Sequence, residues 1–176
     1  LSGGMAQRVA IALALTGSPK ILVADEPTTA LDVTIQAEIL DLLLDLRDAD
    51  GMTILLVTHD LGVVADVCDR VAVMYAGQVI ETGTTEQVLT GPRHPYTKGL
   101  LGAVPDLGGS SSRLAEVPGR VPLPKDWPSG CRFYARCSIH TDECAIAGRR
   151  LPMTGDGHPT RCLKAEELVL AGSEEK

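Results

Sequence analysis

A short apolar run followed by two carboxylates constrains the fold of this chain more than any other feature. The run is ILVA at residues 21–24, and Asp25 and Glu26 follow it directly. A short, wholly apolar run of this kind predicts a buried strand of a parallel sheet. Open parallel sheets carry their chemistry at the C-terminal ends of the strands, where these carboxylates stand. At such an edge one carboxylate can bind Mg²⁺ through oxygen, and the other can polarise a water for attack on a phosphate.

The residues before this strand predict a helix that begins at a glycine-rich turn. Residues 1–8 read LSGGMAQR, Ser2 is a good N-cap, and TGSP at 16–19 stops the helix. The helical spacing puts on one face the residues Met5, Val9, Ala12 and Leu13. The free amides and the positive dipole end of a helix start can bind an anion. An ordinary capped helix is the alternative, since Ser-Gly-Gly is frequent in loops.

A second helix and a second strand follow the carboxylates. Gly51 ends a helix whose expected apolar face consists of Ile35, Ile39, Leu42, Leu43 and Leu46. TILLV at residues 53–57 predicts another buried strand, and His59 comes just after it. A lone histidine after a strand is more often structural than functional. Because His59 emerges at the same sheet edge as Asp25 and Glu26, we favour a functional role for it.

Four motifs, in this order and at these separations, resemble the second half of an ABC-type ATPase domain. LSGGMAQR is similar to the signature motif, ILVADEP to the Walker B strand, TTALD to the D-loop and VTHD to the switch histidine. The resemblance covers residues 1–90, with an expected hairpin at 70–75 and 79–82. It implies an α/β fold: an incomplete P-loop NTPase nucleotide-binding domain that lacks its N-terminal half. Residues 91–176 would form a small, irregular, cysteine-containing extension.

The resemblance also implies a role for each motif residue. Asp25 would hold Mg²⁺, Glu26 would activate the hydrolytic water, and His59 would contact the γ-phosphate and sense hydrolysis. Asp32 would link the two nucleotide sites of a dimer. ATP held by the opposing subunit would contact the signature residues Ser2, Gly3, Gly4 and Gln7. The start of a helix suits this role, because it complements an outside anion without surrounding it.

The phosphate loop of such ATPases is not in this sequence. Neither Gly-x-x-x-x-Gly-Lys-[Ser/Thr] nor any Gly-Lys dipeptide occurs, and the chain begins with Leu1 inside a motif. We therefore expect the C-terminal part of a longer protein, or a truncated gene product. ATPase activity would belong to the intact protein, and this chain alone would be inactive. The absent strands would leave a sheet edge unpaired, which predicts poor solubility.

The region after the ATPase-like part narrows the resemblance. RHPYTKGLL at residues 93–101 is similar to the His-Pro-Tyr segment that follows the ATPase domain in oligopeptide and dipeptide importers, and nickel uptake systems share it. Residues 91–130 are rich in Pro, Gly and Ser, and residues 108–112 read GGSSS. This composition predicts a linker-like stretch that lies along other surfaces instead of forming a packed core.

Four cysteines cluster in the last third of the chain: Cys131, Cys137, Cys144 and Cys162. The absence of a Cys-x-x-Cys pair weakens a zinc assignment without excluding it, and stable disulfides are rare in the reducing cytosol. Loosely spaced thiolates suit a Cys₄ iron–sulfur cluster, which we prefer to zinc, while four unliganded thiols stay an alternative. The importer resemblance implies a [4Fe–4S] cluster. Cys68 is interpreted as a small buried hydrophobe near a helix end. Three histidines are possible ligands that the site does not need: His94, His140 and His158.

Taken together, the resemblance implies the ATP-binding and ATP-hydrolysing subunit of a bacterial ABC importer for dipeptides or oligopeptides. It would use ATP and Mg²⁺ at the cytoplasmic face of the cell membrane, as a peripheral subunit. Its partners would be a second ABC ATPase subunit, two transmembrane permease subunits and an extracytoplasmic substrate-binding protein. A nickel-type importer is the nearest alternative. A metal- or redox-sensing module with a vestigial ATPase half is the other, and the intact Asp25, Glu26 and His59 speak against it.

The composition argues against nucleic-acid binding, and the sequence argues against a membrane-spanning segment. A net charge of −7 and an aromatic content of 3% argue against nucleic acid, which needs clustered cations and stacking surfaces. No apolar stretch approaches the ~20 residues that span a bilayer.

Overall fold

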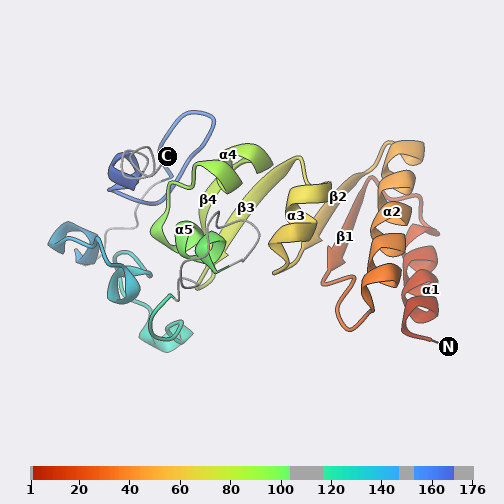
Figure 1. The fold of residues 1–176 in the computed structure, drawn as a ribbon, viewed down its shortest axis with the longest axis horizontal. Helices are drawn as coiled ribbons and strands as arrows, with labels where there is room; N and C mark the ends of the chain where they lie inside the picture. Colours follow the sequence, from red (N-terminus) through yellow and green to blue (C-terminus); the bar gives the residue numbers. More distant parts are fainter. Residues whose placement is uncertain (1, 104–116, 147–152, 169–176) are drawn as a thin grey trace. The chain divides into compact units, whose positions relative to one another are not determined.

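The computed structural model describes residues 2–103, 117–146 and 153–168, and it divides the chain into two compact units (Figure 1). The first unit is Leu1–Val67 and the second is Cys68–Lys176. The division expected from sequence at residue 90 separates an ATPase-like part from an extension, and it stays a prediction. The GGSSS stretch at 108–112 lies outside the described residues.

The first unit is built on two parallel strands with helices beside them. Its elements, in chain order, are α1 (Gly3–Leu15), β1 (Ile21–Asp25), α2 (Val33–Asp50), β2 (Thr53–Val57) and α3 (Leu61–Val67). The β1 and β2 strands pair in parallel with Asp25 opposite Val57, so both strands end at the same level. Helices α1 and α2 lie side by side (Figure 1). The two strands and the parallel pairing expected from sequence are confirmed.

The core of the first unit lies between α1, α2 and one face of the two strands. Its buried members are Ile11, Leu22, Ile39, Leu43 and Met52. The predicted apolar face of α2 is confirmed, because its remaining members pack against this core: Ile35, Leu42 and Leu46. Gly51 ends α2 in the left-handed conformation that glycine adopts without strain (φ 61°).

The face of α1 that the helical spacing selects does not pack against the core. Its large side chains are exposed: Met5 to 48%, Val9 to 57% and Leu13 to 71%. The helix buries Gly4 and Ile11 instead. Hydrophobic residues occur all around α1, so periodicity alone could not select the face. The selection comes from α2, because Gly4 lets the two helices approach: a Cβ on Gly4 would lie 2.6 Å from Cγ2 of Ile35.

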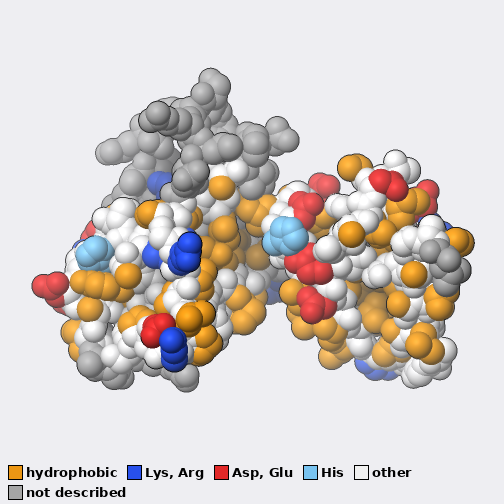
Figure 2. Space-filling model, turned by 90° about the horizontal axis from the view of Figure 1, so that it is seen from below, with side chains coloured by type: hydrophobic (Ala, Val, Ile, Leu, Met, Phe, Trp, Pro, Cys, Tyr) orange, Lys and Arg blue, Asp and Glu red, His pale blue; other side chains and the backbone are white. Residues whose placement is uncertain are grey.

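The strands are also less buried than their apolar sequences predict. Leu22 is buried, but Ile21 and Val23 on the opposite face of β1 are 63% and 60% exposed, and Leu55 of β2 is 55% exposed. One face of the pair packs against the helices and the other carries exposed apolar side chains. Figure 2 shows how much of the described surface is hydrophobic on the side in view.

The second unit begins with the predicted hairpin. Its strands β3 (Arg70–Tyr75) and β4 (Gln78–Thr84) are antiparallel and joined by a turn with positive φ at Ala76 and Gly77. A capping box starts α4 (Thr85–Thr90): the Thr84 hydroxyl accepts from Gln87 N at 3.2 Å, and Gln87 Oε1 accepts from Thr84 N at 2.9 Å. Short 3₁₀ turns follow at Pro124–Asp126, Tyr134–Arg136 and Asp142–Ala145.

The His-Pro-Tyr segment forms the start of α5 (Pro95–Gly102), a helix that composition did not predict. His94 Nδ1 accepts from Tyr96 N at 3.1 Å as the N-cap, and Pro95 occupies the first turn, where no amide donor is needed. The Tyr96 ring lies 4.7 Å from that of Tyr75 and 5.6 Å from that of Phe133. This part of the linker-like region therefore packs into the core of the second unit. None of the described helices is long and apolar enough to cross a bilayer.

Candidate functional site

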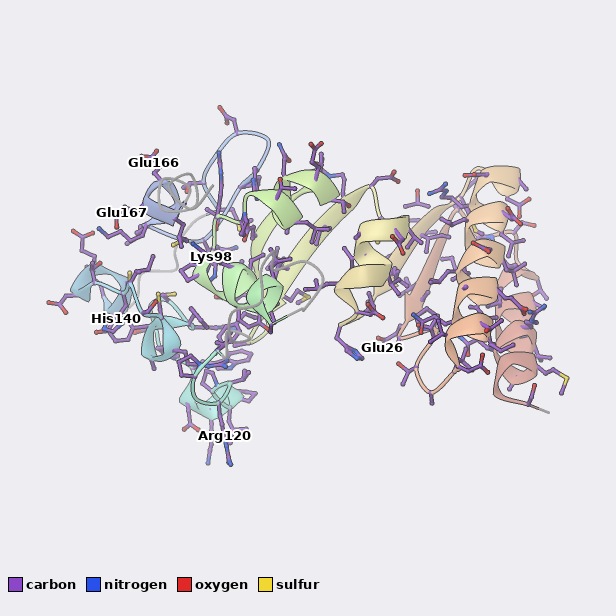
Figure 3. The ribbon with its side chains drawn as sticks, viewed as in Figure 1. Glu26, Lys98, Arg120, His140, Glu166 and Glu167 are labelled. Atoms are coloured by element: carbon purple, nitrogen blue, oxygen red, sulfur yellow. The ribbon has the colours of Figure 1, made fainter. Side chains whose placement is uncertain are left out.

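Glu26 and His59 meet where the two parallel strands end. The Glu26 Oε1 atom lies 2.6 Å from His59 Nδ1, and Oε2 accepts a hydrogen bond of 2.8 Å from the Thr29 hydroxyl. Glu26 N donates to Val57 O at 2.8 Å, which continues the parallel pairing one residue past β1. Figure 3 labels Glu26. The sequence placed both residues at this edge, and the structure joins them by a direct hydrogen bond.

This pair shifts the protonation of both partners. The hydrogen bond from His59, followed by the one from Thr29, lowers the pKa of Glu26. The same hydrogen bond and the charge of Glu26 raise the pKa of His59 above its ordinary value of 6.5. The His59 side chain is 83% exposed, so the imidazole is open to solvent. The site thus offers a carboxylate that can accept a proton and an N–H donor beside it.

The backbone of Glu26 is held in a conformation that few side-chain-bearing residues adopt. Its φ is +48°, in the left-handed region. Such a conformation costs about 1–3 kcal/mol and persists where neighbouring contacts fix it. Here the Val57 carbonyl fixes the backbone, while Thr29 and His59 fix the carboxylate. Asp25, the last residue of β1, is exposed.

The other sequence-predicted residues of this unit have local contacts. The Ser2 hydroxyl accepts from Met5 N at 3.3 Å and caps α1, and Asp32 Oδ1 accepts from Ile35 N at 3.0 Å and caps α2. Gly4 is buried at the contact with Ile35, while Gln7 is half-buried. Capping and close helix approach therefore account structurally for part of these motifs, and a nucleotide role for them stays a prediction.

Sequence reasoning missed three polar residues that shape this edge. Thr29, in the loop after Glu26, orients the carboxylate. Asp60 Oδ1 accepts from Gly62 N at 2.9 Å and from Val63 N at 3.2 Å at the start of α3, and Gln36 reaches Asp60 Oδ2 at 3.5 Å. The signal for Asp60 was available: an acidic residue directly before a short apolar helix is a typical N-cap.

The four clustered cysteines line one pocket of the second unit. Its empty space is about 320 Å³, part of it open to solvent, and all four thiols border it: Cys131, Cys137, Cys144 and Cys162. Cys131 N donates to Cys144 O at 2.8 Å, which closes the loop that carries the first three. Cys162 reaches the pocket from a separate segment near the C-terminal end of the chain. Cys131 and Cys162, 31 positions apart, are thus brought to a single concave site.

The thiols of the pocket are partly desolvated. Burial raises the pKa of Cys131 and Cys137, and it raises the pKa of Cys162 to about 11, with the charges of the other thiols adding to the effect. Lys164 N donates to Cys162 Sγ at 3.4 Å. Within the described residues, no group of three or more His, Cys, Asp or Glu side chains is arranged to hold a metal ion. Cys68 lies directly after α3 and is half-buried, less than expected for a core residue.

The three histidines considered as unneeded ligands have other contacts. His94 borders the pocket, but its Nδ1 is the N-cap acceptor of α5, and burial lowers its pKa to about 4. His158 donates through Nε2 to Glu81 at 2.7 Å. His140 borders the pocket and has Nδ1 2.5 Å from Cys137 O.

Family comparisons match both parts of the chain. The model described as "ABC transporter" matches residues 1–29, and the one described as "Oligopeptide/dipeptide transporter, C-terminal region" matches residues 80–144. The second match contains α5 and three of the four pocket cysteines. The first match contains the signature-like and Walker B-like motifs, and the second contains the His-Pro-Tyr segment.

Curated relatives match nearly the whole chain. A putative peptide import ATP-binding protein of Brucella abortus (strain 2308) is 50% identical over 173 residues, which cover 97% of this chain and 52% of that protein. The dipeptide transport ATP-binding protein DppD of Escherichia coli (strain K12) is 51% identical over 162 residues, 92% of this chain and 50% of that protein. The chain thus spans about half the length of the curated relatives it matches.

Among solved structures, an ATP-binding cassette of an ABC transporter in its ADP conformation matches with a TM-score of 0.50 and 33% identity. The match covers 57% of this chain and 39% of that one. It supports the expected α/β fold of an incomplete ABC-type nucleotide-binding domain. The chain is related, over nearly all its length, to part of the ABC transporter ATP-binding proteins that carry the oligopeptide/dipeptide C-terminal region.

Proposed function

We propose that the intact protein is the ATP-hydrolysing subunit of a bacterial ABC importer for dipeptides or oligopeptides. The observation that carries the proposal is the Glu26–His59 hydrogen bond of 2.6 Å at the shared end of β1 and β2. It joins the carboxylate of a Walker B-like strand to the histidine of a switch-like motif. The peptide-import names of the relatives and the match to the oligopeptide/dipeptide region support the substrate class.

In the proposed mechanism, Glu26 accepts a proton from the water that attacks the γ-phosphate of ATP. Thr29 and the strained backbone hold its carboxylate in place, so little reorganisation is needed at the moment of reaction. His59 presents its N–H beside the γ-phosphate and changes partner once that phosphate leaves. Asp25 fits a Mg²⁺ role, because it offers an exposed carboxylate at the same strand end and Mg²⁺ prefers oxygen ligands.

The signature and D-loop residues act at a dimer interface in this proposal. The α1 start, with Ser2, Gly3, Gly4 and Gln7, faces ATP bound by a second ABC ATPase subunit. Asp32 connects the two nucleotide sites across that interface. The remaining partners are two transmembrane permease subunits and an extracytoplasmic substrate-binding protein, and the subunit works at the cytoplasmic face of the membrane. The sequence lacks a phosphate loop, so we expect no ATP turnover from this chain alone.

We further propose that the four-cysteine pocket holds a [4Fe–4S] cluster, with zinc as the alternative. The fit rests on four thiols around one pocket, and soft thiolate ligands select these metals. A four-iron cluster spreads its thiolate ligands more widely than a single ion does. The four thiols line one pocket, yet the described residues do not form a site for a single ion. This arrangement is compatible with a four-iron cluster. Bound there, the group would cross-link the loop that carries Cys131 to the segment that carries Cys162.

The metal proposal is tested by anaerobic purification, metal analysis and an absorption spectrum. We expect about four iron and about four sulfide per chain with a broad band around 400 nm. About one zinc per chain would keep the ligands and overturn the cluster. No metal would overturn both and return the residues to four unliganded thiols.

The transport proposal is tested by complementation. A chimera joins the part of Escherichia coli DppD that precedes the matched region to this chain, and it is expressed in a strain that lacks DppD. We expect dipeptide uptake to return, and to be lost again with Glu26→Gln. A chimera that hydrolyses ATP yet supports nickel uptake and no dipeptide uptake would overturn the substrate class.

A further inference from the structure

Glu81, in the middle of β4, is a fully buried carboxylate with three hydrogen bonds from two other segments. Its Oε1 accepts from Arg93 N at 2.6 Å and from His158 Nε2 at 2.7 Å, and its Oε2 accepts from His94 N at 3.1 Å. The Arg93 guanidinium adds a bond of 3.1 Å to the His158 carbonyl. We refer to Glu81, Arg93, His94 and His158 as the Glu81 cluster.

The proposed nucleotide and metal chemistry does not use the Glu81 cluster. Burying a carboxylate is costly unless donors surround it, and an apolar residue would fill an inward strand position at no such cost. Removing one donor would leave the buried carboxylate of Glu81 partly unsatisfied, which is costly. The cluster therefore ties His158, 77 positions further along the chain, to one place on β4.

From His158 the chain follows β4 toward the pocket. Thr82 N donates to Pro159 O at 3.0 Å, and Thr160 Oγ1 donates to Ile80 O at 3.2 Å. Arg161 donates twice, from its backbone N to Ile80 O at 2.7 Å and from Nε to Val79 O at 2.8 Å. The next residue is Cys162. Segment 158–161 is thus bound along β4, and its register decides where the Cys162 thiol lies.

The other three thiols are placed without this segment. The bond from Cys131 N to Cys144 O closes their loop, and Gly130 packs so closely that a Cβ there would lie 2.4 Å from Cys144 O. Cys137 N donates to Tyr134 O at 3.2 Å within the same loop. Of the four, Cys162 is the one that directly follows a segment hydrogen-bonded along β4.

We propose that Glu81 is the positioning residue that, through His158, sets the register of segment 158–161 and holds Cys162 against the other three thiols. This role of Glu81 serves the pocket only if the pocket binds a metal group, so it rests on the proposed metal function. The register of segment 158–161 rests on contacts within this chain alone. The metal proposal and the register proposal can therefore fail separately.

The test compares His158→Gln with His158→Leu, two side chains of similar size. The Gln amide keeps an N–H donor for Glu81, whereas Leu has none. Alkylation of each cysteine is followed by mass spectrometry on the full chain under native conditions, after metal removal with a chelator. We expect His158→Leu to raise the rate at Cys162 relative to Cys144 by at least about tenfold, because the lost bond lets the segment open locally. We expect His158→Gln to stay near the unsubstituted protein.

A cavity variant separates this effect from general loosening. Leu101→Ala truncates a buried apolar side chain of α5 and leaves the hydrogen bonds of the Glu81 cluster in place. It should destabilise the second unit while leaving the Cys162 to Cys144 ratio unchanged. The proposal is overturned if both His158 variants behave alike, if His158→Leu leaves the ratio unchanged, or if all four cysteines react faster together.

Metal content of the same preparations distinguishes the two proposals. An unsubstituted protein that binds neither iron nor zinc overturns the metal function, while the alkylation ratio still decides the role of Glu81. Metal retained in full by His158→Leu with an unchanged ratio overturns the role of Glu81 and leaves the metal function standing.

Discussion

Glu26 illustrates how far a residue can be predicted from sequence. Its position after an apolar strand, and the placement of His59 at the same edge, followed from the parallel-sheet pattern. Its left-handed backbone and its bond from Thr29 did not, because both depend on the path of the loop after β1. The sequence therefore predicted which groups meet at the site, while tertiary contacts decide how the carboxylate is oriented.

The Glu26–His59 pair makes a prediction about titration. The pKa of His59 is raised above its ordinary value of 6.5, and the pKa of Glu26 is lowered below its ordinary value of 4.5. The stabilisation from this pair is therefore fully present between pH 4.5 and pH 6.5. It is lost as the pH rises through the raised pKa of His59, and as it falls through the lowered pKa of Glu26. Glu26→Gln should move the pKa of His59 down toward 6.5, measured by NMR titration of the imidazole. An unchanged pKa in this variant would mean that the two side chains do not interact.

Gly4 makes a prediction about packing. Alanine usually gains about 1 kcal/mol over glycine in a helix. At Gly4 the new Cβ would meet Cγ2 of Ile35 at 2.6 Å, and overpacking costs about 1–3 kcal/mol. We expect Gly4→Ala to lower the free energy of unfolding of the first unit, measured by urea denaturation. Adding Ile35→Ala should make Gly4→Ala neutral or favourable, and Gly17→Ala is the control because nothing lies within 4 Å of its Cβ.

Helices of this chain differ in how well their sequence predicts them. The α2 face was predicted correctly because polar residues mark its other side. In α1, apolar residues occur on every side of the helix, and contact with α2 decides which face is buried. Helix α5 was hidden by its glycines and by the surrounding Pro- and Gly-rich composition. Its signals were His94 as a capping acceptor and Pro95 in the first turn.

The buried N-cap of α5 makes a prediction about pH. The pKa of His94 in the fold is about 4, below its ordinary value of 6.5, because burial disfavours the imidazolium. The unfolded chain takes up this proton first, so stability is full above 6.5 and declines as the pH falls toward 4, by up to about 3 kcal/mol. His94→Asn keeps a capping acceptor without this titration. Its free energy of unfolding should fall less between about pH 7 and about pH 5 than that of the unsubstituted protein; equal slopes would contradict the assignment.

The described surface of the first unit makes a prediction about the whole molecule. The face of β1 and β2 away from the helices exposes Val23 and Leu55 to 60% and 55%. Exposed apolar strands promote association, so we expect oligomers or aggregates of this chain by light scattering. Val23→Thr with Leu55→Thr should raise the monomer fraction, while Leu22→Thr, at a buried position of the same strand, should not. A monodisperse unsubstituted chain would contradict this expectation.

ATP hydrolysis by the chimera of DppD and this chain tests the central claim most directly. The DppD part is expected to supply the phosphate loop, and this chain supplies Glu26 and His59. We expect turnover in the unsubstituted chimera, and a fall of at least about a hundredfold with Glu26→Gln while ATP binding and the ATP-bound dimer are retained. Unchanged hydrolysis in Glu26→Gln would show that this carboxylate does not activate the water and would overturn the proposed site.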